Sequence, residues 1–282
     1  MTLPPSSAPD TQKLHWVDAH CHLQDPRLDP HRPQVLERAA EAGVGLVHVA
    51  ATSESDWPAV AALADAHPEF VLCSFGLHPW FIHDRHPHWL DHLRDTLAGR
   101  SAGIGEIGLD GGMDDGLEAD RDAVFLAQLD LSFELALPAS IHCRGAWGRM
   151  LDILLARPPH PAGLLLHAYA GPPDALPALA AKNVHISFGG TLTRPNAKKA
   201  LKNAKKALKN RFLVESDAPD LPPTLAEGQK AHFRDENGKI LSEPAYIPYI
   251  GQLLADLRGT TPAQIAAETT ATARRLFAPL LT

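Results

Sequence analysis

Eight short and almost uninterrupted apolar runs are the feature that most constrains how this chain can fold. They have the length of β-strands, and stretches with helical periodicity separate them: His15–His20, Gly45–Ala50, Phe70–Gly76, Ala102–Glu106, Pro138–His142, Gly163–His167, Val184–Phe188 and Arg211–Glu215. Strands that are apolar on both faces are typical of a parallel sheet covered on both sides. The sequence therefore predicts an α/β fold built on parallel strands.

The segments between these runs have helical patterns, for example Arg32–Ala42, Glu54–Ala66, Trp89–Ala98, Glu118–Leu137 and Trp147–Ala156. Eight strand–helix units that close on themselves form a (β/α)8 TIM barrel. The stretch Pro244–Leu281 is expected to add two C-terminal helices.

No linker or change in composition divides the 282 residues, and one barrel of roughly 250 residues accounts for most of them. We expect a single domain over residues 14–282. Residues 1–13 are predicted to form a disordered tail, with no apolar run that could serve as a signal peptide or membrane span. The three cysteines form no C-x-x-C pair, which fits a reducing cytoplasm better than a disulfide framework or a thiolate metal site. A monomer is the default expectation.

The formal net charge of −7 argues against a protein whose main role is to grip nucleic acid. It does not exclude an enzyme that acts on a nucleic-acid end, where metal ions supply positive charge locally. One basic element is the duplicated heptad A-K-K-A-L-K-N at Ala197–Asn203 and Ala204–Asn210, with six lysines. It is either a solvated outer helix of the barrel, which we favour, or a basic stripe that follows phosphates.

The first apolar run ends in the sequence V-D-A-H-C-H, which provides Asp18, His20 and His22. Residues i and i+2 of a strand point to the same side, so the two imidazoles can converge on one ion. An isolated H-x-H pair has little specificity in a chain with 16 histidines.

Four later runs also end on, or are followed by, a polar residue of metal-binding type: Glu106, His142, His167 and Asp217. The carboxyl ends of the strands of a parallel barrel meet at one mouth, where active sites are built. A histidine with a structural role is the ordinary alternative at any single position. The coincidence of five strand ends favours a metal centre.

Nitrogen and oxygen ligands with a carboxylate able to bridge suit Zn²⁺ or Mn²⁺, and Mg²⁺ at a more oxygen-rich position. Five or more ligands are too many for one tetrahedral zinc. We therefore expect two divalent ions, about 3.5–4 Å apart.

The chain resembles the TatD family of metal-dependent, deoxyribonuclease-type hydrolases in the amidohydrolase superfamily, from about Trp16 to Phe277. The motifs that carry the resemblance are D-A-H-C-H at 18–22, G-L-H-P at 76–79, G-E-I-G-L-D at 105–110, I-H-C-R at 141–144, L-H-A-Y-A-G at 166–171, G-G at 189–190 and E-S-D-A-P at 215–219.

The resemblance implies a ligand set and an activity. His20, His22 and Asp217 would hold the first metal, His142 and His167 the second, and Glu106 would bridge them. The activity implied is hydrolysis of phosphodiester bonds in DNA, in some members as a 3′–5′ exonuclease, with a hydroxide shared by the two metals attacking phosphorus.

Four residues receive roles beside or within this ligand set. Asp217 is the candidate general base. Arg144 is expected either to bind a phosphate oxygen or to form a surface ion pair, and His78 either to contact the phosphate or leaving group or to shape the turn before Pro79. Asp18 is expected to orient a ligating histidine rather than to bind the ion itself.

Three aromatic residues in the loops, Trp80, Phe81 and Tyr169, could stack on a base or simply pack against their neighbours. The chain also departs from the family pattern, which predicts an aromatic residue after Asp110 where this sequence has Gly111–Gly112. Asparagine is usual where Ser242 and Thr272 stand. These departures concern the shape of the substrate pocket.

The sequence leaves three functions open. The first is a two-metal phosphodiesterase acting on DNA or a small phosphodiester. The second keeps the metals but acts on another ester, an amide or a lactone, since the same barrel supports many hydrolyses. The third is an accessory protein that binds metal without turnover, against which the intact Asp217 argues.

Overall fold

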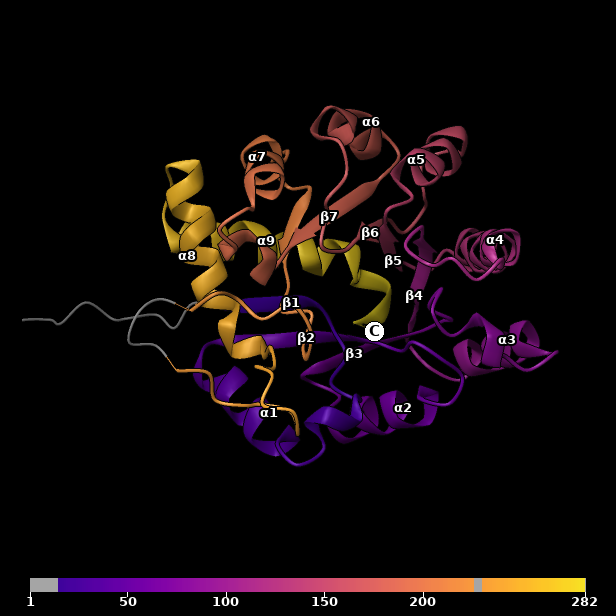
Figure 1. Cartoon of the computed structure of the whole chain (residues 1–282), viewed down its shortest axis with the longest axis horizontal. Helices are drawn as coiled ribbons and strands as arrows, with labels where there is room; N and C mark the ends of the chain where they lie inside the picture. The colour runs from indigo at the N-terminus through magenta and orange to yellow at the C-terminus, as the bar shows by residue number, and fades with distance from the viewer. Residues whose placement is uncertain (1–14, 226–229, 282) are drawn as a thin grey trace, which may run out of the picture.

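The computed structural model describes residues 15–225 and 230–281, so the tail predicted at 1–13 lies outside the described residues. Its centre is an eight-stranded parallel sheet in which each strand pairs with the next along the chain (Figure 1). The strands are β1 Trp16–Cys21, β2 Val44–Ala50, β3 Val71–Phe75, β4 Gly103–Asp110, β5 Ala139–Arg144, β6 Leu164–Leu166, β7 Val184–Phe188 and β8 Phe212–Val214. The strand order confirms the predicted barrel.

The barrel closes at its carboxyl edge through the segment that follows β8. The N–H of Asp217 donates to the carbonyl of His20 at 3.0 Å, and the N–H of His22 donates to the carbonyl of Ala218 at 2.6 Å. These bonds join the end of β1 to the chain beyond β8. Two predicted groups of site residues are thereby held together by the backbone itself.

Helices surround the strands, as Figure 1 shows. They are α1 Arg32–Glu41, α2 Trp57–Ala66, α3 Trp89–Ala98, α4 Glu118–Leu135, α5 Trp147–Ala156, α6 Leu176–Ala181, α7 Lys198–Lys206, α8 Ile247–Arg258 and α9 Pro262–Leu276. The two C-terminal helices were predicted, and α9 begins with a capping box formed by Thr261 and Gln264. In the described part of the chain, no helix is long and apolar enough to cross a membrane.

The lysine-rich repeat forms α7 in the outer layer, where it lies against α8 (Figure 1). The helix is shorter than the repeat predicts, because the backbone leaves helical geometry at Ala207. The guanidinium of Arg258 donates to the carbonyls of Ala204 and Ala207 at 2.8 and 3.0 Å, which satisfies carbonyls at the helix end. Leu208, in the second heptad of the repeat, lies beyond the end of this helix and is 38% exposed.

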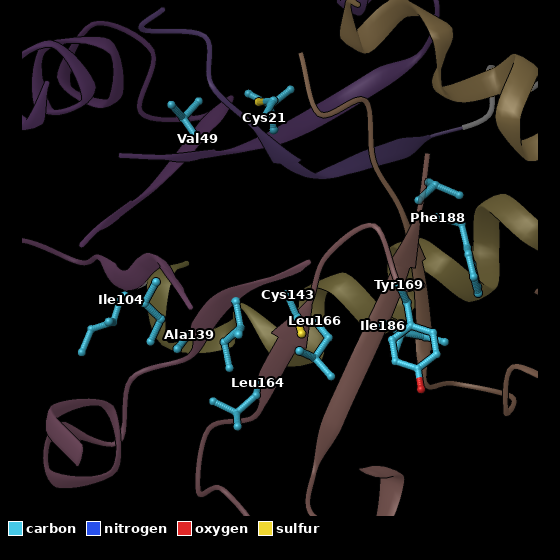
Figure 2. Packing of buried hydrophobic residues seen from close by; sticks show 14 of the residues in the cluster. Cys21, Val49, Ile104, Ala139, Cys143, Leu164, Leu166, Tyr169, Ile186 and Phe188 are labelled. Carbon is cyan, nitrogen blue, oxygen red and sulfur yellow. The ribbon is translucent and has the colours of Figure 1, made fainter. Parts of the chain in front are cut away.

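Two apolar clusters make the core. The larger one lies between the strands and the helices, and Figure 2 shows part of it around Ile104, Leu164 and Ile186. The smaller one joins β1, β2, β3, β6 and β8 to α9 and the short turn after it. Its members are Val17, Ala19, Leu46, Leu72, Leu165, Leu213, Ala273, Leu276, Phe277 and Leu280. The C-terminal helix is therefore part of the barrel's own core.

One buried histidine makes the stability of the fold sensitive to acid. The N–H of Gly163 donates to Nδ1 of His160 at 2.9 Å, so Nε2 carries the proton and donates to Oγ of Ser132 at 3.1 Å. Burial lowers the pKa of His160 to about 4, below the ordinary value of 6.5. The contribution of His160 to the free energy of unfolding is complete above pH 6.5, where this imidazole is neutral in the unfolded chain as well. It is lost as pH falls towards 4.

We expect His160→Gln to be less stable than wild type at pH 7, and the difference to shrink by roughly 1–3 kcal/mol between pH 7 and pH 4. Urea unfolding of both proteins across this range measures the difference. A difference that stays constant with pH would show that His160 does not titrate in this way.

Candidate metal centre

The six predicted metal ligands meet at the carboxyl ends of the strands, with Glu106 at their centre. Its Oε2 lies 3.3 Å from Nε2 of His20 and 3.2 Å from Nε2 of His22. Its Oε1 lies 2.8 Å from Nε2 of His167 and 3.2 Å from Nδ1 of His142. The two oxygens of one carboxylate thus face two separate pairs of histidines.

Asp217 completes the group around Oε2 of Glu106. Its Oδ1 lies 3.6 Å from Nε2 of His22 and 3.8 Å from Nε2 of His20. The backbone of Asp217 has φ of +52°, in the left-handed region that aspartate adopts more readily than most residues. Strained backbone of this kind clusters at active sites, and here it accompanies a carboxylate held beside two histidines.

The chemistry of this cluster fits divalent cations. Nε2 of His20 and Oε1 of Glu106 are buried, and neither has a hydrogen-bond partner among residues 15–225 and 230–281. Buried polar atoms without partners are costly, and a cation between them would satisfy both. Candidate ligand atoms in the described chain also gather, within 4.8 Å of one another, in three overlapping groups: His20, His22 and Asp217; His20, Glu106 and His167; His78, Glu106 and His142.

Hydrogen bonds behind two of the rings select which nitrogen faces inward. Nδ1 of His22 lies 2.8 Å from the carbonyl of Ala50, which can only accept, so in the neutral ring Nδ1 carries the proton and Nε2 is bare. Nε2 of His142 lies 3.2 Å from a carboxylate oxygen of Asp110, so in the neutral form of this ring Nδ1 is bare. In both rings the bare nitrogen is the one that faces Glu106, as metal binding requires.

Charges within the cluster shift its protonation. Burial alone would lower the pKa of His22, but the hydrogen bond and charge of Glu106 raise it to about 10. Burial alone would raise the pKa of Glu106, but the histidines around it, His167 first, hold it well below its usual range. Burial raises the pKa of Asp217 to about 7. Protons therefore occupy the cluster near neutral pH, and a metal that binds must displace them.

The inward position of Glu106 depends on an irregularity in β4. The register with β5 shifts between Ile104 and Ile107, and Gly105 between them has φ of +150°. A Cβ on Gly105 would lie 3.0 Å from the side chain of Ser140, so a larger residue does not fit. A bulge of this kind re-aims a side chain, and here it lets both isoleucines join the outer core while Glu106 points to the mouth.

His78 lies in the loop after β3, with its ring buried. Nδ1 accepts the backbone N–H of Trp80 at 3.2 Å, so the ring's proton sits on Nε2, which lies 3.5 Å from Oε1 of Glu106. Burial lowers the pKa of His78 to about 3, which keeps the ring neutral. This arrangement makes His78 an N–H donor at the mouth in addition to part of the turn before Pro79.

The side chain of Asp18 contacts backbone rather than a ligand ring. It accepts the N–H of Ser216 at 2.9 Å and of His20 at 3.3 Å, and the hydroxyl of Ser216 at 2.5 Å. The ring of His20 instead has Oγ of Ser140 at 2.8 Å from its Nδ1. Asp18 therefore fixes the backbone before Asp217 and the backbone of His20, not the orientation of an imidazole.

Asp110, which has no role predicted from the sequence, holds Arg144 and the candidate ligand His142 together. Nε of Arg144 donates to both carboxylate oxygens, at 3.1 and 2.9 Å, and Nε1 of Trp80 donates at 2.6 Å. Burial alone would raise the pKa of Asp110, but the hydrogen bonds from His142 and its other donors hold it well below its ordinary value. The available signal was the aspartate that closes the motif G-E-I-G-L-D.

The aromatic residues divide into two kinds. Trp80 and Phe81 are 42% and 36% exposed, so their rings are accessible at the mouth. Tyr169 is buried, packs edge-on against Trp147 and donates its hydroxyl to the carbonyl of Pro172 at 2.8 Å. The interpretation that a base could stack on Tyr169 is therefore wrong, because this ring is buried in the core.

A family model described as "TatD related DNase" matches residues 17–278. The chain belongs to the TatD family. Membership makes it a metal-dependent hydrolase, in agreement with the buried histidine and carboxylate clusters that are able to bind metal.

Individual TatD-family proteins align over most of their length. The "uncharacterized metal-dependent hydrolase YabD" of Bacillus subtilis is 30% identical over 263 residues, which cover 92% of this chain and 98% of the relative. The "3'-5' ssDNA/RNA exonuclease TatD" of Erwinia tasmaniensis is 29% identical over 266 residues, with the same coverage of 92% and 98%. Among solved structures, the TatD homologue YjjV of Escherichia coli has a TM-score of 0.83 at 28% identity, covering 93% of this chain and 98% of that one.

Proposed function

We propose that this chain is a two-metal hydrolase that cleaves phosphodiester bonds at the end of a DNA strand. The observation that carries the proposal is the position of Glu106, whose two oxygens face two separate pairs of histidines at 2.8–3.3 Å. A carboxylate placed in this way is suited to bridge two ions. A single tetrahedral ion would leave some of these ligands unused.

The residues would divide between two ions as follows: His20, His22 and Asp217 would hold the first, His142 and His167 the second, and Glu106 would be shared between them. When bound, Zn²⁺, Mn²⁺ or Mg²⁺ would supply Lewis-acid charge for the phosphoryl oxygens and would acidify water. The tautomers of His22 and His142, each with its bare nitrogen inward, support this division.

The protein's own groups then handle protons and orientation. The Asp217 carboxylate, held at the mouth by its left-handed backbone, accepts the proton of the attacking water. Neutral His78 directs its Nε2 proton towards the same space and donates to a phosphoryl or leaving oxygen. Arg144 has a side chain that is 59% exposed, and its guanidinium attracts a phosphate to the mouth.

A nucleic-acid substrate is supported by the name of the Erwinia tasmaniensis relative, a 3'-5' ssDNA/RNA exonuclease, and by two exposed aromatic rings at the mouth, Trp80 and Phe81. Base stacking on such rings tolerates any base. We further propose that residues 14–282 act as one domain and that the protein works as a monomer.

Metal removal and reconstitution test the proposal. We expect the metal-stripped protein to cleave neither single-stranded DNA nor bis(p-nitrophenyl) phosphate, and activity to return with Mn²⁺, Mg²⁺ or Zn²⁺. Asp217→Ala, assayed in parallel, is the control against a contaminating nuclease. Binding of metal without cleavage of either compound would contradict the phosphodiester assignment and point to another ester, an amide or a lactone.

A further inference from the structure

We propose that Asp110 is a positioning residue that links the metal ligand His142 to two side chains that meet the substrate, Trp80 and Arg144. Its carboxylate is buried, with 4% of the residue exposed, and lies at the end of β4. It accepts hydrogen bonds from all three residues and from the N–H of Gly112. The inference rests on the proposed function in taking His142 as a ligand.

The inner contact of Asp110 fixes how His142 faces the metal centre. Nε2 of His142 donates to Oδ2 of Asp110 at 3.2 Å, which leaves Nδ1 bare and directed at Oε1 of Glu106, 3.2 Å away. A carboxylate behind a ligating imidazole fixes its tautomer and makes the ring a stronger ligand. A metal ion held by His142 would therefore depend on Asp110 without touching it.

The outer contacts of Asp110 hold a ring and a cation at the mouth. Oδ2 accepts Nε1 of Trp80 at 2.6 Å and Nε of Arg144 at 2.9 Å. The guanidinium carbon of Arg144 lies 5.4 Å above the centroid of the Trp80 ring, within the range of a cation–π contact. Since Asp110 engages the Nε edge, the terminal amino groups of Arg144 can be turned to a second anion such as a phosphate.

Two glycines make room for this arrangement. A Cβ on Gly112 would lie 3.0 Å from Nη2 of Arg144 and 3.2 Å from Oδ1 of Asp110, so a side chain there would press on the pair. A Cβ on Gly111 would lie 2.8 Å from the carbonyl oxygen of Gly145 in the neighbouring loop. The same two positions depart from the family pattern, which predicts an aromatic residue after Asp110.

Asp110→Asn tests the inner contact, because one amide oxygen replaces two carboxylate oxygens where four N–H groups converge. We expect the variant to lose affinity for one of two Mn²⁺ ions by about 10–100-fold in calorimetric titration, with the other ion retained. Asp122→Asn is the matched control, because Asp122 also accepts from an arginine, Arg149, at 2.7 Å but has no contact with His142 among the described residues. Wild-type affinity for both ions in Asp110→Asn would overturn the proposal.

Trp80→Phe tests the outer contact and does not depend on the folding of Asp110→Asn. It keeps an aromatic ring but removes the N–H that Asp110 accepts. We expect Mn²⁺ to change the tryptophan fluorescence of wild type and not of Trp80→Phe, and this variant to raise KM for DNA with little change in kcat. An equal fluorescence change in both proteins would contradict the proposal that Asp110 connects His142 to Trp80.

These readouts separate the present inference from the proposed function. Metal affinity and fluorescence are measured without any substrate. If wild type binds two ions and Asp110→Asn loses one, but neither DNA nor bis(p-nitrophenyl) phosphate is cleaved, the positioning role stands and the substrate assignment fails.

Discussion

Glu106→Gln is expected to lower kcat/KM by roughly 10⁴-fold, the size of effect seen when one member of a catalytic unit is removed. The amide keeps the volume of the side chain but offers one acceptor oxygen, while its NH₂ group would face histidine nitrogens that lie 2.8–3.3 Å from the present carboxylate. Both groups of ligands would lose their shared anion. Elemental analysis of the purified variant is expected to find less than one ion per chain.

Glu118→Gln is the control for this change, because Glu118 is an exposed glutamate in the first turn of α4. It should retain wild-type metal content and rate. A Glu106→Gln protein with two ions and near wild-type activity would remove Glu106 from the bridging position.

Asp217→Asn is expected to lower kcat by about 10²–10⁴-fold while retaining an ion at the His142 and His167 group. The amide cannot accept the proton of the attacking water. Glu106, His142 and His167 are untouched by the change, with Oε1 of Glu106 still 2.8 Å from His167. The loss should therefore be mainly in turnover, and metal content should fall by no more than one ion.

Asp220→Asn provides the comparison for Asp217→Asn within the same loop. The Asp220 carboxylate pairs with Arg27 at 2.7 Å, and its side chain is 42% exposed. Removing this charge should leave kcat unchanged. Equal losses in the two variants would mean that the loop as a whole, rather than Asp217, sets the rate.

The barrel and the meeting of the ligands could be predicted from the sequence because both follow from one rule. Buried parallel strands have continuous apolar sequences. Polar residues that end several such strands must meet at the carboxyl end of the barrel. The prediction that β4 ends at Glu106 was nevertheless wrong. The strand continues to Asp110, because Ile107 and Leu109 extend the pairing with β5.

Other parts of the site depend on backbone detail that residue patterns do not carry. The bulge at Gly105 and the left-handed backbone of Asp217 are set by tertiary contacts, such as the bond from the Asp217 N–H to the carbonyl of His20. The Asp18 carboxylate was expected to orient a histidine ring. It instead accepts hydrogen bonds from the backbone N–H and the hydroxyl of Ser216. Sequence spacing predicts that a carboxylate lies at a strand end, but it does not predict which groups donate hydrogen bonds to that carboxylate.

The apolar cluster that joins Phe277 and Leu280 to Leu46, Leu72, Leu165 and Leu213 of the strands makes the interior of the barrel a packed core and not a tunnel. In the proposed reaction, a DNA chain bound at the metal centre could not pass through the barrel to its far side. A released nucleotide would then have to leave by the opening that the remaining strand occupies. Product release and substrate movement would share that opening, which favours dissociation after short bursts over long uninterrupted degradation.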